Sequence, residues 1–303
     1  MTLLTFNASV FCLEELTKGL HKQLICFSVI NIVIAFTTIA GNTLILIALP
    51  KVTSIHPPSK VLLRNLVASD LCVGLVEITI VIYWISIVQE WWQICRHFYF
   101  AHVIGATISL TACLWTIIAI SLDRLLALLL GLRYRQVVTL RRAYVAVIIF
   151  WLFPSFGSVG VGFCSHEAWE LLLITSIVLC LIISIYCYTR IFLRLRHPQT
   201  HVRDSAQEQA NQTIPMNITR YKKTVSIAMW LQLALLFCYF PYVVVAPFAY
   251  REIQTRQSSA FFLSLHATVT LMFCNSTLNP ILYCWKIKEV RREVKDAAIN
   301  LFS

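Results

Sequence analysis

Seven long apolar segments, separated by short polar connections, form the main pattern of the chain. A helix that crosses a bilayer needs about 20 predominantly apolar residues, and each segment reaches that length. The predicted spans cover residues 25–49, 60–87, 97–128, 142–163, 168–195, 221–249 and 258–284. The pattern therefore predicts an all-α membrane protein, a bundle of seven transmembrane helices.

The segments on either side of residues 25–284 are short. Residues 1–24 form a predicted extracellular N-terminus, and 285–303 form a predicted amphipathic helix with a short cytoplasmic tail. In this last segment apolar residues recur at helical spacing with Lys and Arg between them, which suits a helix on the inner leaflet. The alternative is a frayed basic tail, which the regular apolar stripe disfavours.

Composition and charge support a membrane protein and give its orientation. The chain is 58% hydrophobic and 13% charged, whereas soluble domains carry roughly a quarter of their residues as charges. Most of the 25 Lys and Arg residues follow spans one, three, five and seven, which predicts an extracellular N-terminus and a cytoplasmic C-terminus. The net charge of +11 is then membrane-surface charge and not a nucleic-acid footprint. The exceptions are Lys18, Lys22, Arg96, Arg251 and Arg256.

The N-terminal 24 residues carry one candidate modification site. They lack a basic start followed by an apolar core, so we expect no cleavable signal peptide and the first span as signal anchor. Asn7 begins an Asn-Ala-Ser sequon on the predicted outside, where glycosylation is expected.

Five polar residues interrupt the apolar spans: Asn42, Asp70, Asn275, Ser276 and Asn279. A carboxylate at the bilayer centre costs several kcal/mol unless it is solvated or paired. These residues could join helices by hydrogen bonds alone. We favour one polar cluster around Asp70 that holds water or a small cation such as Na⁺, because three different spans supply it.

A second set of residues indicates a bundle that changes shape. Asp123 and Arg124 end the third span, either as a snorkelling pair or as a latch that frees the arginine. Pro241 and Pro280 lie inside the sixth and seventh spans, where proline removes a backbone hydrogen bond and bends the helix. A static bend is the alternative; a movable one favours a switch.

Two other functional classes fit less well. The sequence has no nucleophile–base pair and no metal-ligand cluster, so we expect neither an enzyme nor a metal protein, and no cofactor. A transporter or channel is the alternative, since Asp70 and Glu77 could mark an ion path. Seven spans without an inverted repeat make a poor transport pathway.

The motifs together resemble the rhodopsin-like (class A) G-protein-coupled receptors over essentially the whole chain. They are Gly41-Asn42, Leu66 to Asp70, Asp123-Arg124-Leu125, Trp151 with Pro154, Tyr188, Cys238 to Pro241 and Asn279 to Tyr283. Leu125 replaces the tyrosine of the third-span motif, and Tyr239 replaces the tryptophan of the sixth-span motif. Seven motifs in order, each on its expected helix, carry the resemblance.

The resemblance implies a receptor that couples an extracellular small molecule, lipid or peptide to a heterotrimeric G protein. The sixth helix would swing outward and Arg124 would meet the G protein. The short connection between spans four and five, Cys180 in place of a proline and the displaced Cys95 are most similar to the melanocortin, lysophospholipid, cannabinoid and adenosine group. The implied switch residues are Asp123, Arg124, Tyr188, Tyr239, Pro241, Pro280 and Tyr283.

The resemblance also implies a disulfide at the outer end of the third span. The family's cysteine would fall at Tyr99, whereas this chain has Cys95 one turn earlier. We expect Cys95 to pair with Cys164, with Cys12 as the competing partner.

A ligand pocket is expected toward the outer side of the bundle. The aspartate that binds monoamines in the family would fall at Ala106, so a monoamine receptor is disfavoured. Glu77 lies two turns beyond Asp70 on the same helix face and would either attract a basic ligand group or pair with another helix. The other candidate lining residues are His102, Ala106, Tyr242, Phe248, His266 and Val269.

Overall fold

The structure is a computed structural model that describes the backbone of residues 10–53, 55–162, 166–196, 215–286 and 288–302. Side chains are described in these ranges except at 132, 158–169, 195–232, 286 and 300–302. Seven helices in this part are long and apolar enough to cross a membrane, which confirms the predicted fold class. They are α3 (His21–Ala48), α4 (Pro57–Val88), α5 (Trp92–Leu130), α7 (Leu140–Gly162), α8 (His166–Arg196), α10 (Pro215–Arg256) and α11 (Ser259–Lys286).

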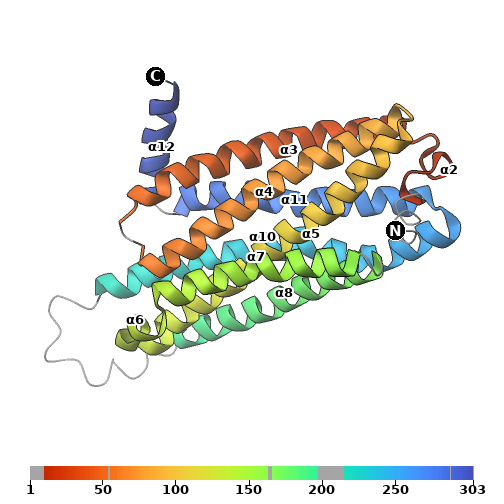
Figure 1. The fold of residues 1–303 in the computed structure, drawn as a ribbon. Helices are drawn as coiled ribbons and strands as arrows, with labels where there is room; N and C mark the ends of the chain where they lie inside the picture. Colours follow the sequence, from red (N-terminus) through yellow and green to blue (C-terminus); the bar gives the residue numbers. More distant parts are fainter. Residues whose placement is uncertain (1–9, 54, 163–165, 197–214, 287, 303) are drawn as a thin grey trace, which may run out of the picture.

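The seven helices lie side by side in one bundle (Figure 1). Helix α5 packs against α4, α7 and α8, while α10 packs against α8 and α11, and α11 closes the bundle against α3. Short elements lie at the ends: α2 (Glu14–Thr17) at one, and η1 (Leu49–Lys51), η2 (Gly131–Arg133), α6 (Tyr134–Val137) and α12 (Lys288–Phe302) at the other. We call these the α2 end and the α12 end.

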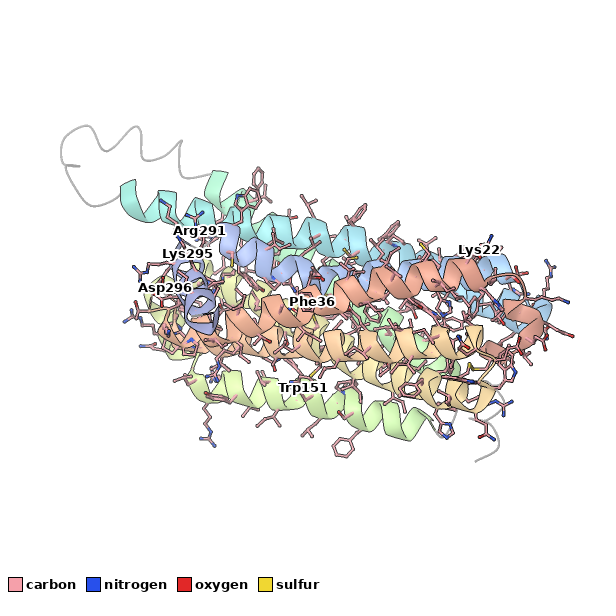
Figure 2. All side chains as sticks on the ribbon, turned by 90° about the horizontal axis from the view of Figure 1, so that it is seen from above. Lys22, Phe36, Trp151, Arg291, Lys295 and Asp296 are labelled. Atoms are coloured by element: carbon pink, nitrogen blue, oxygen red, sulfur yellow. A yellow bond between two sulfur atoms is a disulfide. The ribbon has the colours of Figure 1, made fainter. Side chains whose placement is uncertain are left out.

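The bundle surface is apolar along its length and charged at its ends. Phe36, halfway along α3, is 72% exposed, and Phe156 and Phe237 are exposed to a similar extent. Figure 2 places Lys22 near the α2 end and Arg291 near the α12 end. Large apolar side chains exposed in the middle of the bundle suit contact with lipid chains, since hydrocarbon cannot form hydrogen bonds with polar groups.

Close helix contacts depend on small residues. A Cβ atom added to Gly74 of α4 would lie 2.8 Å from Cγ1 of Ile39 on α3, so α3 and α4 approach more closely there than a larger residue would allow. A Cβ atom on Gly41 would lie 3.2 Å from Pro280 of α11. Small residues at such crossings are typical of membrane helices.

Helix α12 is a separate helix beside the α12 end of the bundle, as predicted for residues 285–303. Val290 is buried in one core cluster with Tyr283. The Glu289 carboxylate accepts hydrogen bonds from the backbone N–H of Thr53 at 2.8 Å and from its hydroxyl at 3.1 Å. These contacts fix the start of α12 against the connection between α3 and α4.

The expected Cys95–Cys164 disulfide is wrong, because Cys95 pairs with Cys12 across a Cα–Cα distance of 6.2 Å. The physical reason is the position of the segment around Cys12, where Phe11 stacks on Tyr99, one turn from Cys95. Cys164 and the predicted glycosylation site Asn7 lie outside the described residues.

Candidate functional site

The predicted polar cluster forms around Asp70 in the middle of the bundle. Asp70 is fully buried, and Oδ2 accepts a hydrogen bond from Nδ2 of Asn279 at 2.8 Å. Its Oδ1 lies 3.5 Å from the Sγ donor of Cys113 on α5. The amide of Asn42 donates to the backbone carbonyl of Ser276 at 3.1 Å and so ties α3 to α11. Two of the five predicted residues thus bond directly, and Asn42 reaches α11 through its backbone.

The side chains of the remaining two members, Asn275 and Ser276, are buried, and neither Asn275 Nδ2 nor Ser276 Oγ has a hydrogen-bond partner in the described part of the chain. An unpartnered buried N–H donor is costly, and a water molecule that accepts its hydrogen bond would satisfy it.

A second polar site lies at the α12 end, around the buried Asp123. Its Oδ2 accepts a hydrogen bond from Ser59 Oγ at 2.8 Å, and Oδ1 accepts one from the Tyr134 hydroxyl at 2.6 Å. The guanidinium of Arg124 lies 3.2 Å from the same carboxylate. Asp123 and Arg124 are therefore paired as expected. Ser59 on α4 and Tyr134 on α6 were not predicted, since no sequence pattern marks them.

Tyr134 stays a hydrogen-bond donor at any ordinary pH. Burial, followed by its hydrogen bond to Asp123, raises the pKa of Tyr134 to about 12. The phenol is therefore protonated near neutrality and can hold the Asp123 carboxylate in place.

The other predicted switch residues lie in the bundle interior. Ser121 Oγ donates to the Tyr188 hydroxyl at 3.3 Å, which joins α5 to α8. Tyr239 and Tyr283 are buried, and their hydroxyls have no partner among the described side chains and backbone. Pro241 and Pro280 lie inside α10 and α11.

A narrow cavity of about 60 Å³ lies toward the α2 end of the bundle. Five predicted ligand residues line it: His102, Ala106, Tyr242, His266 and Val269. His102 and Ala106 lie one turn apart on α5, and His266 and Val269 lie one turn apart on α11, so each pair faces the cavity.

Two predicted residues lie elsewhere. Glu77 is fully buried but does not line the cavity, and Ile80, one turn further along α4, does so instead. Both Glu77 carboxylate oxygens lack a hydrogen-bond partner in the described part of the chain, so pairing with another helix is not seen either. Phe248 is 64% exposed on the lipid-facing side of α10, so its assignment to the pocket is wrong.

The lining residues that the sequence analysis missed include three aromatic residues and one carboxylate: Phe11, Tyr99, Tyr250 and Glu170. Glu170 is a carboxylate near the start of a predicted span, and this position could have marked it as a candidate. The sequence contains no comparable signal for Phe11, because its place in the cavity depends on the path of the N-terminal segment.

The fold and the two polar sites are those expected of a heptahelical receptor. The model of the family "7 transmembrane receptor (rhodopsin family)" matches residues 41–283. The chain belongs to this family, the rhodopsin-like (class A) G-protein-coupled receptors.

Among curated proteins the chain is similar to melanocortin receptors. It is 25% identical to melanocortin receptor 5 of Ovis aries over 261 residues, which cover 84% of this chain and 78% of that protein. It is 23% identical to melanocortin receptor 4 of Danio rerio over 293 residues, or 92% of this chain and 86% of that protein. It is 23% identical to melanocortin receptor 3 of Rattus norvegicus over 289 residues, or 92% and 87%. The similarity places the chain near the melanocortin group and favours a receptor over a transporter or an enzyme.

Proposed function

We propose that the receptor lies in the plasma membrane with its α2 end outside, binds a ligand in the α2-end cavity and activates a heterotrimeric G protein at the α12 end. The observation that carries the proposal is the cavity itself, where aromatic side chains surround a few polar groups. Ligand sites are typically apolar clefts with a small number of placed polar groups. Asp123 and Arg124 lie at the opposite end, where release of the arginine would expose a cation to a cytoplasmic partner.

The lining residues favour a ligand that carries an aromatic ring and a basic group. Tyr99, Tyr242 and Tyr250 offer ring faces, and aromatic pairs contribute about 0.5–1.5 kcal/mol beyond the buried area. Glu170 supplies a carboxylate to the same cavity, which would attract a cation. Aromatic amines and short basic peptides with an aromatic residue both satisfy these two requirements.

A ligand screen with a charge-neutral variant tests this proposal. Aromatic amines and short basic peptides are applied to cells, and G-protein dissociation is recorded for the parent and for Glu170→Gln. We expect activating compounds to lose at least about tenfold in potency on Glu170→Gln, since a buried charge-assisted hydrogen bond contributes about 1.5–3 kcal/mol.

The matched control is Glu252→Gln, because Glu252 pairs with Arg256 at 3.4 Å on α10 and does not line the cavity. Activating compounds with equal potency on Glu170→Gln and the parent would show that this carboxylate does not bind the ligand.

We further propose that the Asp70 cluster binds Na⁺. The Asp70 carboxylate receives one amide donor and one weak thiol donor, whereas a carboxylate can accept about four hydrogen bonds. The remaining oxygen lone pairs suit a hard cation, which prefers oxygen ligands. Purified receptor should unfold at a higher temperature in NaCl than in choline chloride at equal ionic strength, and Asp70→Asn should abolish the difference. An unchanged sodium effect in Asp70→Asn would place the ion elsewhere.

A further inference from the structure

The N-terminal segment Val10–Thr17, which we call the N-terminal plug, enters the cavity of the proposed ligand site. Phe11 is 1% exposed and is one of the lining residues. Its ring stacks on Tyr99 of α5 at a centroid distance of 5.0 Å and meets Tyr250 of α10 edge-on at 5.7 Å. The ring therefore lies between two helices that the proposed function assigns to ligand binding.

Three anchors hold the N-terminal plug on three different helices. The Tyr83 hydroxyl of α4 donates to the Phe11 carbonyl at 3.0 Å, and Ser259 Oγ at the start of α11 donates to the Leu16 carbonyl at 2.8 Å. The Cys12–Cys95 disulfide adds a covalent link to α5, directly beside Phe11 in the sequence. The anchors at Phe11, Cys12 and Leu16 together hold the Phe11 ring in the cavity.

The space left beside Phe11 is too small for most ligands. The cavity measures about 60 Å³, whereas pockets for drug-sized ligands measure roughly 300–1,000 Å³. Any ligand larger than a few water molecules must displace side chains. Phe11 is the lining residue that belongs to the N-terminal plug and not to a transmembrane helix.

We propose that the N-terminal plug is a built-in competitor for the ligand site, with Phe11 occupying the place of a ligand's aromatic ring. This inference rests on the proposed function of the cavity. The disulfide keeps the plug at a high effective concentration, so an external ligand binds only to the fraction of receptors from which Phe11 has withdrawn. The ligand is therefore an aromatic-bearing molecule that replaces Phe11 between Tyr99 and Tyr250.

Access to the cavity can be measured without knowing the ligand. Ala106 lines the cavity and is 8% exposed, so Ala106→Cys places a thiol there. The probe is a small cationic methanethiosulfonate reagent, and its rate of reaction at position 106 is read by mass spectrometry of the purified full chain. We expect at least about tenfold faster labelling when Phe11→Ala is added to Ala106→Cys, because the occluding ring is gone.

Two further variants sharpen the comparison. Glu15→Ala is the matched control, since Glu15 belongs to the same segment but is exposed, and it should leave labelling slow. The double substitution Cys12→Ser with Cys95→Ser should accelerate labelling while keeping Phe11, because the tether is lost. Equal labelling rates for Ala106→Cys with and without Phe11→Ala would overturn the proposal. Acceleration by Glu15→Ala equal to that by Phe11→Ala would overturn it as well.

Misfolding is monitored within the same experiment. Cys113 is fully buried beside Asp70 and does not line the cavity, so its labelling must stay slow in every variant that is scored. Phe11→Leu, which keeps an apolar side chain but removes the ring, provides a milder variant and should give an intermediate rate.

The labelling assay requires no G protein, so the two proposals fail in different ways. Faster labelling of Phe11→Ala in a receptor that activates no G protein would support the plug and contradict the proposed function. G-protein activation with unchanged labelling would support the receptor function and contradict the plug.

Discussion

The hydrogen bond between Asn279 and Asp70 connects α11 to α4 in the middle of the bundle, and Asn279→Ala removes it. Asn279 Nδ2 donates to Asp70 Oδ2 at 2.8 Å, and both side chains are almost completely buried. The substitution leaves a buried carboxylate with the thiol of Cys113 as its remaining hydrogen-bond donor among those described here. A carboxyl group that loses its strong amide donor in a low-dielectric interior is destabilised, because the thiol is a weak donor.

The expected destabilisation follows from the type of bond. Hydrogen bonds to charged groups contribute about 1.5–3 kcal/mol in soluble proteins, while interhelical bonds in a membrane bundle average about 0.6 and reach about 1.7 kcal/mol. We therefore expect a loss of about 1–2 kcal/mol. For a chain of this size each kcal/mol shifts the unfolding temperature by about 2–4 °C, which gives a decrease of roughly 2–8 °C.

The receptor contains its own reporter of unfolding. Cys113, Cys180, Cys187 and Cys238 are free and buried, so a thiol-reactive fluorescent dye should respond as the detergent-solubilised bundle opens on heating. The matched control is Asn275→Ala, which removes an amide of the same size from α11 whose nitrogen has no partner among the described residues. If Asn279→Ala unfolds no earlier than Asn275→Ala, the Asp70–Asn279 bond does not stabilise this bundle.

Two further predictions concern the α12 end and the packing of α3 on α4. Tyr134→Phe removes the 2.6 Å hydrogen bond to Asp123, so the Asp123 carboxylate holds Arg124 more strongly. Ligand-independent G-protein signalling should therefore fall about threefold at equal surface expression. Unchanged or raised signalling would contradict this latch. Gly74→Ala places a Cβ atom 2.8 Å from Ile39 and should destabilise the bundle by about 1–3 kcal/mol in the same dye assay. A variant as stable as the parent would show that Ile39 moves aside freely.

The parts of the fold that the sequence predicted depend on local composition. Seven spans were recognised because the thickness of the hydrocarbon core requires about 20 apolar residues in each helix that crosses it. The helix ends agree less closely: α10 begins at Pro215, six residues before the predicted span at 221–249, because polar residues continue the helix beyond the membrane segment. His102 and His266 were predicted to line a cavity as polar residues within apolar spans, and Ala106 through the family resemblance, and all three do line it.

The partners of these residues were decided by the tertiary structure. Asp123 has hydrogen-bond donors on α4 and α6, and no local pattern distinguishes Ser59 and Tyr134 from other polar residues at helix ends. Glu77 shares the sequence spacing of a cavity residue but is buried outside the cavity, because the neighbours of α4 determine which of its faces borders an open space.

The sequence by itself determined that this chain is a seven-helix membrane receptor and that its interior carries a polar layer at Asp70. The spans follow from long runs of apolar side chains, and the receptor class follows from the motif resemblance. The polar layer follows from the high cost of Asp70 in hydrocarbon, wherever the helices lie relative to one another. Only the tertiary structure decided that Cys95 bonds to Cys12 and that Phe11 enters the cavity. These contacts join residues far apart in the chain, and their formation depends on the path of the N-terminal segment over the bundle, which apolar periodicity does not specify.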